Sequence, residues 1–418
     1  MSAGAGPATE APLAAAVRYL RTPEAIRERA GALLARGLAG RLRHFAVDPG
    51  RLDGAADLVA LVTRLRYPDL AIPPHSRWRH FGAGGRDRVA ELERALGGAP
   101  PDERARAKLD LAVTSVLLDA GAGPAWRYVE ADTGQAHARS EGLAVASFRL
   151  FAAGFFSADP GAPWRADAAR LEAISDEQLA GALQVSGDNP LPGLAGRATV
   201  LRRLGRALRS APELFGRREP RPGHLLDALR AGARPGAVEA PGILSAVLEG
   251  LGSIWPGGPG LGGAPLGDVG RHPDAGGAGP TAGFVPLHKL SQWLVYSTIE
   301  PLAEAGLAVT ALDRLTGLAE YRNGGLFVDT GVLRPRHDAV VRTVHRPGDE
   351  AVVEWRALTV ALLDRLAPLV RARLGPAARD LPLAAILEGG TWAAGRRLAA
   401  ERRGGAPPIQ VESDGTVM

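Results

Sequence analysis

A segment around residue 290 places four polar side chains at helical spacing. Pro286 suits the first turn of a helix, and it is followed by Lys289, Gln292, Tyr296 and Glu300. At about 3.6 residues per turn, these four side chains form one stripe along a helix. An ammonium, an amide, a phenol and a carboxylate on one face would bind a polar ligand well if that face lined a pocket. A solvated helix face is the competing interpretation, and the spacing alone favours it.

Two carboxylates downstream, Glu320 and Asp329, are candidates for catalysis. Segment 315–325 is consistent with a helix, a glycine-containing hairpin and a second helix, which loosely resembles the helix-hairpin-helix glycosylases. The segment around Asp329 resembles the catalytic-aspartate segment of those enzymes, although the spacing is shorter here. Cleavage of an N-glycosidic bond needs a carboxylate that stabilises the charged sugar transition state and orients or deprotonates water. For Asp329, a role as a cap or turn residue is an equal alternative.

Glu320 follows Gly317 closely, which indicates a position where a helix begins. A carboxylate at a helix start accepts hydrogen bonds from backbone amides and tends to stay ionised. We therefore expect an ionised Glu320, with Asp329 as its competitor for the catalytic role.

Two further segments carry basic side chains that could hold a phosphate. One is the Gly/Pro-rich segment 256–283, which contains Asp268, Arg271 and His272. A flexible surface loop is an equal alternative for that segment. The other is the polar and aromatic run from His75 to Phe81, which contains Arg77 and Arg79 and could bind an anion. A surface loop anchored by its tryptophan is the slightly favoured alternative.

The composition excludes several classes of chemistry. The chain has no cysteine, so disulfides, thiolate catalysis and cysteine-ligated metal sites are excluded. Its nine histidines lack the HExxH spacing of zinc proteases, and the phosphate-loop, dinucleotide-binding and nucleophile-elbow motifs are missing. We expect no metal and no cofactor.

The distribution of charge argues against nucleic-acid binding. The net charge is only +5, and Lys108 and Lys289 are the two lysines in a chain whose arginines are scattered among acids. No apolar stretch is long enough to span a membrane, and the N-terminus lacks the pattern of a signal peptide. We expect a cytoplasmic protein with no nucleic-acid or membrane partner; the sequence leaves the oligomeric state open.

Apolar periodicity predicts a mainly α, multi-helical fold with a minor β hairpin. Residues 1–12 are predicted to be a disordered tail, 13–403 a single helical catalytic unit that could comprise two lobes, and 404–418 a C-terminal tail. The helix at 140–157 is apolar on nearly every side, so we expect it to be buried. The other predicted helices are 13–42, 51–66, 106–120, 167–183, 194–209, 223–230, 241–250, 286–305, 311–322, 351–373 and 391–402, and the hairpin is 126–139.

Five runs of sequence resemble the family of uracil catabolism protein four. They are Ile72–Phe81, Ser115–Gly123, Ser140–Phe148, His288–Leu294 and Glu320–Gly325. The resemblance spans about residues 15 to 400. One departure is that the family usually has Cys-Trp where this chain has Val269 and Gly270, which leaves Asp268, Arg271 and His272 unaffected.

The resemblance implies a pathway that opens the ring of a uracil nucleotide and ends in urea. Such a pathway needs a step that breaks the bond between urea and ribose. A remoter resemblance, to the queuosine-salvage nucleotide N-glycosylases, covers the Lys289 helix and the segment Glu320-Tyr321-Arg322, where those enzymes have Asp-Tyr-Arg. It implies catalysis by Glu320 and substrate contacts by Lys289, Tyr321 and Arg322, and it favours Glu320 over Asp329.

The leading hypothesis is therefore a hydrolase that releases urea and ribose 5-phosphate from a ribosylurea-type nucleotide. Glu141 and Asp119 are expected to make secondary polar contacts with the substrate. A uracil phosphoribosyltransferase is the alternative enzyme, although Glu130–Gly134 only half fits the expected motif. A helical scaffold or RNA-associated protein is the non-enzymatic alternative.

Overall fold

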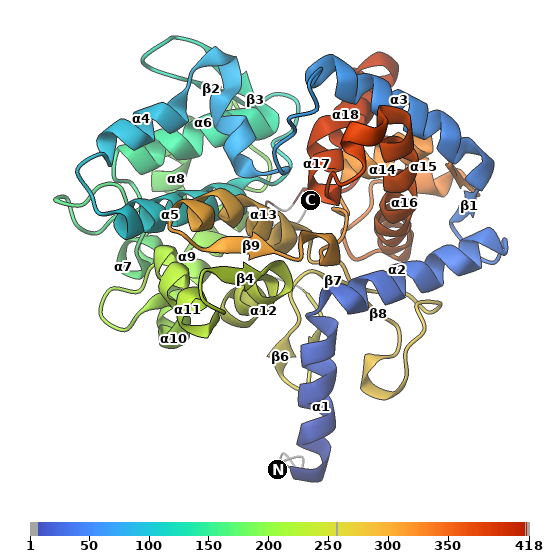
Figure 1. Cartoon of the computed structure of the whole chain (residues 1–418), viewed down its shortest axis with the longest axis horizontal. Coiled ribbons are helices and arrows are strands. Elements are labelled where there is room, and N and C mark those ends of the chain that lie inside the picture. The colour runs from blue at the N-terminus through green and yellow to red at the C-terminus, as the bar shows by residue number, and fades with distance from the viewer. Residues whose placement is uncertain (1–6, 256–257, 414, 416–418) are drawn as a thin grey trace. The chain divides into compact units, whose positions relative to one another are not determined.

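The computed structural model describes residues 7–255, 258–413 and 415 (Figure 1). These residues divide into two compact units. The first unit contains residues 7–75, 258–292 and 311–412, and the second contains residues 76–255, 293–310, 413 and 415. Helix α13 (Lys289–Glu304) begins in the first unit and continues in the second. None of the described helices is long and apolar enough to cross a membrane.

The first unit is organised around α16 (Glu350–Leu374), in which every residue from Ala351 to Leu363 is buried. Helices α2, α3 and α14 pack against α16, and α14 also packs against α18. The helical elements of this unit are α1 (Pro7–Leu20), α2 (Pro23–Leu38), η1 (Pro49–Arg51), α3 (Leu52–Arg66), η5 (Gly279–Thr281), η6 (Leu312–Arg314), α14 (Tyr321–Asp329), α15 (Ala339–Arg342), α16, η7 (Pro376–Ala378), α17 (Leu383–Ile386), the π-helical turn η8 (Leu387–Thr391) and α18 (Trp392–Arg403).

Helices α14 and α18 run parallel. Gly395, in the first turn of α18, packs against the backbone of Arg322 at the start of α14. At their other ends, Arg403 forms an ion pair with Asp329. The first residues of the two helices therefore lie at the same end of this pair.

The second unit surrounds α5 (Pro101–Leu118) and α6 (Arg139–Ala152), which pack against each other. Residues 142–148 of α6 are all buried, as the apolar pattern predicted, and the helix ends before Gly154, which adopts a left-handed conformation with φ 72°. The other helical elements are η2 (Arg77–Gly85), α4 (Arg88–Ala95), α7 (Ala168–Glu172), α8 (Asp176–Ala182), α9 (Leu194–Ser210), α10 (Pro212–Phe215), η3 (Pro222–His224), α11 (Leu225–Gly232), α12 (Ala240–Leu251) and η4 (Gly252–Ile254).

The strands of the described residues are short and form two-stranded sheets, so the mainly α prediction is confirmed. The pair β2 (Arg127–Val129) and β3 (Ala136–Ala138) is the predicted hairpin. The other pairs are β1 (Phe45–Val47) with β10 (Leu333–Pro335), β4 (Ala237–Glu239) with β9 (Ala308–Thr310), β5 (Gly260–Leu261) with β6 (Ala264–Pro265), and β7 (Val269–Arg271) with β8 (Phe284–Pro286).

Local signals explain where the N-terminal prediction differs from the structure. The helix predicted at 13–42 is two helices, because Thr22 caps α2 by accepting a hydrogen bond from the Ala25 amide and Pro23 occupies its first position. Helix α1 begins at Pro7 instead of Leu13, so the predicted tail at 1–12 is partly helical, and residues 1–6 lie outside the described residues.

The helix predicted at 311–322 is wrong. Only Leu312–Arg314 form a 3-10 turn there, residues 315–320 lie in neither a helix nor a strand, and α14 begins at Tyr321. Gly324 and Gly325 lie inside α14, so the predicted helix-hairpin-helix is not formed. Gly324 is inside the helix for a packing reason, since a β-carbon there would overlap the indole of Trp355. Pro286 ends β8 instead of opening α13.

We predict that Gly395→Ala lowers the free energy of unfolding by about 1–3 kcal/mol, the usual effect of overpacking a core. An added β-carbon would overlap the carbonyl oxygen of Arg322 and force α18 away from α14. Gly31→Ala is the matched control, because Gly31 lies inside α2 and a β-carbon added there would meet no neighbouring atom within 4 Å. That substitution should stabilise the protein by up to about 1 kcal/mol. Urea denaturation of both variants measures the difference, and equal stabilities would contradict the packing argument.

Candidate functional site

Glu320 is the N-cap residue of α14. Its backbone is extended, with φ −112° and ψ 161°, and its carboxylate accepts hydrogen bonds from the amides of Arg322 at 2.6 Å and Asn323 at 2.5 Å. The first amides of a helix have no partner within the helix, so an acidic N-cap satisfies them and complements the helix dipole. The predicted position of Glu320 at a helix start is thus what the structure shows.

The electrostatic consequence differs from the prediction. Burial raises the pKa of Glu320, and the two amides together with the charges of Lys289 and Arg322 only partly offset that effect. The pKa therefore lies above its usual value, instead of being held down by the helix start. A carboxylate with a raised pKa is a stronger base than an ordinary glutamate, which suits proton transfer.

Lys289 is the first residue of α13, and Asp268 holds it there. The Asp268 carboxylate accepts a hydrogen bond from the amide of Lys289 at 3.0 Å. The Asp268 carbonyl accepts hydrogen bonds from the amides of Leu287 and His288. His288 has a positive φ of 43°, an uncommon conformation for a residue with a side chain. The Lys289 side chain is buried, and its charge acts on Glu320.

Arg356 connects the two halves of this cluster. It donates two hydrogen bonds to Asp268, at 2.8 and 2.7 Å, and a third to the carbonyl of Ala319 at 3.1 Å. Burial alone would raise the pKa of Asp268, but Arg356 leaves it lowered. Arg356 was not among the residues predicted from the sequence, although an arginine in the middle of an apolar helix indicates a buried ion pair.

The predicted stripe lies on α13, with Lys289 and Gln292 in the first unit and Tyr296 and Glu300 in the second. Gln292 is buried and exchanges hydrogen bonds with Thr316, which anchors the non-helical segment leading to Glu320. In the second unit, Tyr296 is buried and Glu300 accepts hydrogen bonds from Ser76 and Arg79. Because Lys289, Gln292 and Tyr296 are all buried, the solvated-face interpretation is wrong.

The two candidate carboxylates lie at opposite ends of α14. Asp329 is the last residue of the helix and forms a bidentate ion pair with Arg403, with hydrogen bonds of 2.8 and 2.6 Å. At about 1.5 Å of rise per residue, the nine residues of α14 separate it from Glu320 by about 13–14 Å along the helix. Arg322 is buried beside Glu320, donates to the carbonyl of Gly405, and lies over the ring of Tyr321 at 4.8 Å.

The residues predicted to hold phosphate in segment 256–283 do not converge. The exposed Arg271 side chain lies on the ring of Phe284, 3.8 Å from its centroid. His272 is buried and contacts Glu354 at 3.1 Å, while its other ring nitrogen accepts the amide of Asp274. Among the residues that the structure describes, no three His, Asp or Glu side chains are grouped as metal ligands would be.

A second polar cluster, in the second unit, surrounds Arg77. The buried guanidinium donates to Ser115 at 2.6 Å and lies 3.1 Å from Asp119, and the charge of Glu141 also acts on it. Ser140 donates to Asp119 at 2.6 Å. Two acidic groups thus balance Arg77, so this cluster has no excess positive charge with which to attract a phosphate. Arg79 is engaged with Glu300 instead.

Comparison with known proteins identifies the family. A family model described as "Protein of unknown function (DUF1688)" matches residues 19–418. The chain belongs to the DUF1688 family. It is 39% identical to uracil catabolism protein 4 of Lachancea kluyveri over 411 residues, which cover 90% of this chain and 93% of that protein. It is 38% identical to protein urg3 of Schizosaccharomyces pombe over 409 residues, 96% of this chain and 98% of the relative.

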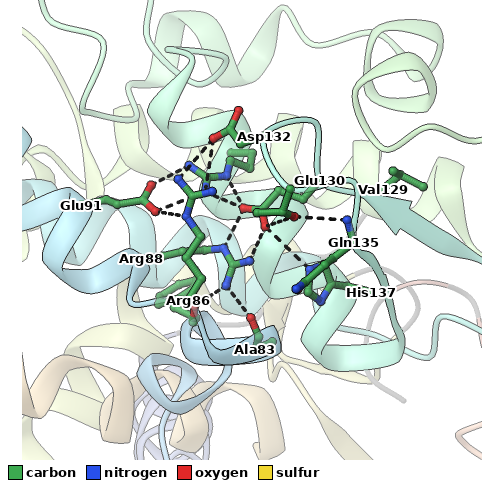
Figure 2. A network of polar contacts seen from close by, with 12 residues as sticks. Ala83, Arg86, Arg88, Glu91, Val129, Glu130, Asp132, Gln135 and His137 are labelled. Atoms are coloured by element: carbon green, nitrogen blue, oxygen red, sulfur yellow. Dashed lines mark hydrogen bonds and ion pairs between the residues drawn. The ribbon is translucent and has the colours of Figure 1, made fainter.

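In this DUF1688 protein, an ion-pair network holds the hairpin that leads to Ser140 and Glu141 (Figure 2). Glu130, fully buried at the end of β2, accepts hydrogen bonds from Arg88 at 2.9 and 2.5 Å and from Arg149 at 2.5 Å. Arg88 also donates to two carbonyls of η2, the element that begins with Arg77. The network therefore joins the hairpin, η2 and α6 within the second unit.

We predict that Glu130→Gln lowers the free energy of unfolding by about 3–5 kcal/mol at pH 7, because Arg88 is left buried without its counter-charge. Burial acts to raise the pKa of Glu130, but Arg88 and Arg149 bring it down from 4.5 to about 2. Its stabilising effect is complete above pH 4.5 and is lost as the pH falls through about 2. Denaturation at pH 7 and pH 3 should show a smaller difference between wild type and variant at pH 3. A difference independent of pH would contradict an ionic role for Glu130.

Proposed function

We propose that this protein acts in uracil catabolism as a hydrolase that cleaves the N-glycosidic bond of a ribosylurea-type nucleotide. The products would be urea and ribose 5-phosphate. The observation that carries the proposal is the Glu320 carboxylate. It caps α14, has a raised pKa and interacts electrostatically with Lys289 and Arg322. A basic carboxylate beside two cations suits a substrate that has a phosphate and develops positive charge on its sugar.

In the proposed reaction, water attacks the anomeric carbon of the ribose as the bond from that carbon to the urea nitrogen breaks. Glu320 orients this water, takes its proton and stabilises the positive charge on the sugar. Its two backbone hydrogen bonds fix the carboxylate so that little reorganisation accompanies the reaction. Lys289 and Arg322 bind the phosphate or the sugar hydroxyls, and the Asp268–Arg356 pair holds Lys289 in place.

The names of the relatives support the pathway. The Lachancea kluyveri protein is named for uracil catabolism, and its similarity extends over nearly the whole of both chains. The resemblance of the Glu320-Tyr321-Arg322 segment to the queuosine-salvage nucleotide N-glycosylases supports the cleavage of an N-glycosidic bond. The other enzyme considered, a phosphoribosyltransferase, gains no support, because Glu130 of its half-fitting motif is buried in an ion pair with Arg88.

We predict that Glu320→Gln lowers the turnover of a ribosylurea 5-phosphate by about 100-fold or more, while the substrate still binds. The amide keeps the shape of the side chain and removes its charge and basicity. Asp329→Asn is the matched control, since Asp329 is paired with Arg403 at the far end of α14. Release of urea by the purified variants is the measurement. An inactive Asp329→Asn variant together with an active Glu320→Gln variant would assign the catalytic role to Asp329. Normal turnover by both variants would refute a catalytic role for either carboxylate.

We predict that Lys289→Met weakens the binding of ribose 5-phosphate by roughly 10-fold to 100-fold, corresponding to a charge-assisted hydrogen bond of about 1.5–3 kcal/mol. Lys108→Met is the control, because Lys108 is engaged with Glu93 and Glu304 in the second unit. Isothermal titration calorimetry of the folded variants measures both affinities. Unchanged affinity in Lys289→Met would remove Lys289 from the phosphate site.

A further inference from the structure

Another buried carboxylate in the first unit, Glu388, contacts a histidine. One of its oxygens lies 2.8 Å from Nδ1 of His75. The other oxygen accepts hydrogen bonds from Arg66 at 2.9 Å and from the hydroxyl of Tyr67 at 3.0 Å. The amide of His75 also donates to the carbonyl of Ala384, so both backbone and side chain of His75 are held against this part of the unit.

Glu388 lies in the π-helical turn η8 between α17 and α18. Such turns disturb the regular hydrogen bonding of a helix and occur frequently at functional sites. Here Arg66 donates to the backbone carbonyls of Glu388 and Gly389. Gly390 packs closely against α3, and a β-carbon added to Gly390 would overlap the side chain of Thr63. The neighbouring elements therefore support an unfavourable turn, and that turn directs Glu388 at His75.

The donor set of Glu388 determines which nitrogen of His75 carries a proton. Burial acts to raise the pKa of Glu388, but His75, Arg66 and Tyr67 lower it to about 2, so the group is an ionised acceptor at neutral pH. Nδ1 of His75 must then donate its N–H to the carboxylate. Nε2 is then the ring nitrogen that can exchange a proton with a substrate, the arrangement found where a carboxylate orients a catalytic histidine.

Both His75 and Glu320 lie near the first residues of the helix pair α14 and α18. The ring of His75 lies 6.2 Å from the ring of Trp392, the first residue of α18. Glu320 caps the first turn of α14, which runs parallel to α18 and begins beside it. Two groups suited to proton transfer, a basic carboxylate and an oriented imidazole, are thus found near the start of these two helices.

We propose that His75 is the proton donor to the leaving urea and that Glu388 is its positioning residue. This assignment rests on the proposed function. As the bond between the anomeric carbon and the urea nitrogen breaks, its electron pair stays on the nitrogen, which takes the proton from Nε2 of His75. Water supplies hydroxide to the anomeric carbon, and its remaining proton goes to Glu320. The imidazole ends neutral, with its Nδ1 proton still donated in the hydrogen bond to Glu388, and proton exchange with solvent restores His75 and Glu320.

The test compares two substrates that differ in their need for a proton donor. Urea is a poor leaving group, whereas nitrophenolate leaves without protonation, so ribosylurea 5-phosphate and nitrophenyl ribofuranoside 5-phosphate are the probes. His75→Gln should lose about 100-fold or more in kcat on the first and only a few-fold on the second. Glu388→Gln should show the same selectivity, and Glu388→Asp should recover part of the lost rate. Glu320→Gln should lose activity on both substrates.

His345→Gln is the matched control, because His345 is another buried histidine of the first unit, bonded to the carbonyl of Val340. It should leave both rates unchanged. Equal losses on both substrates in His75→Gln, with active wild type, would overturn the role of His75 and leave the proposed function standing. Wild-type protein that releases neither urea nor nitrophenol would refute the proposed function and this assignment together.

Discussion

The candidate site of the first unit depends on the guanidinium of Arg356, buried in the middle of α16. Its bonds to Asp268 and to the carbonyl of Ala319 tie the start of α13 to the segment that leads into α14. A single planar donor thus positions Lys289 on one side and Glu320 on the other. Removing either partner would leave a charge in the core without compensation, so this pair constrains both segments.

The pKa shifts of two carboxylates in the first unit, Glu320 and Glu388, have opposite directions because the groups that donate to them differ. Glu320 accepts hydrogen bonds from two neutral backbone amides. The effect of burial is larger than theirs, so the pKa of Glu320 is raised. Glu388 receives an arginine, a histidine and a phenol, and these outweigh burial, which lowers its pKa to about 2. One carboxylate is therefore suited to accepting a proton, and the other to remaining charged and orienting an imidazole. Such a separation of environments is how enzymes assign different roles to similar groups.

Much of the architecture was predictable from local pattern, and the errors have local causes. The apolar run of α6 and the turn segment Asp132–Gly134 of the hairpin predicted both elements. The helix predicted at 311–322 is not formed, because Glu320 caps a separate helix that begins at Tyr321. Gly324 lies inside that helix, where the lack of a β-carbon leaves room for Trp355. The polar stripe on α13 was predicted correctly as a helix face, but its partners, Thr316 for Gln292 and Ser76 and Arg79 for Glu300, are distant in sequence.

The sequence by itself determined the helical class and the family, and it singled out Lys289 and Glu320 as candidates, because periodicity, composition and short motifs are properties of neighbouring residues. Only the tertiary structure decided which charges are compensated. Asp329 is paired with Arg403, Arg77 with Asp119, and Glu388 with His75 and Arg66. The reason is physical: the energy of a charge depends on its burial and on the donors around it, and in this fold those donors come from segments far apart in the chain.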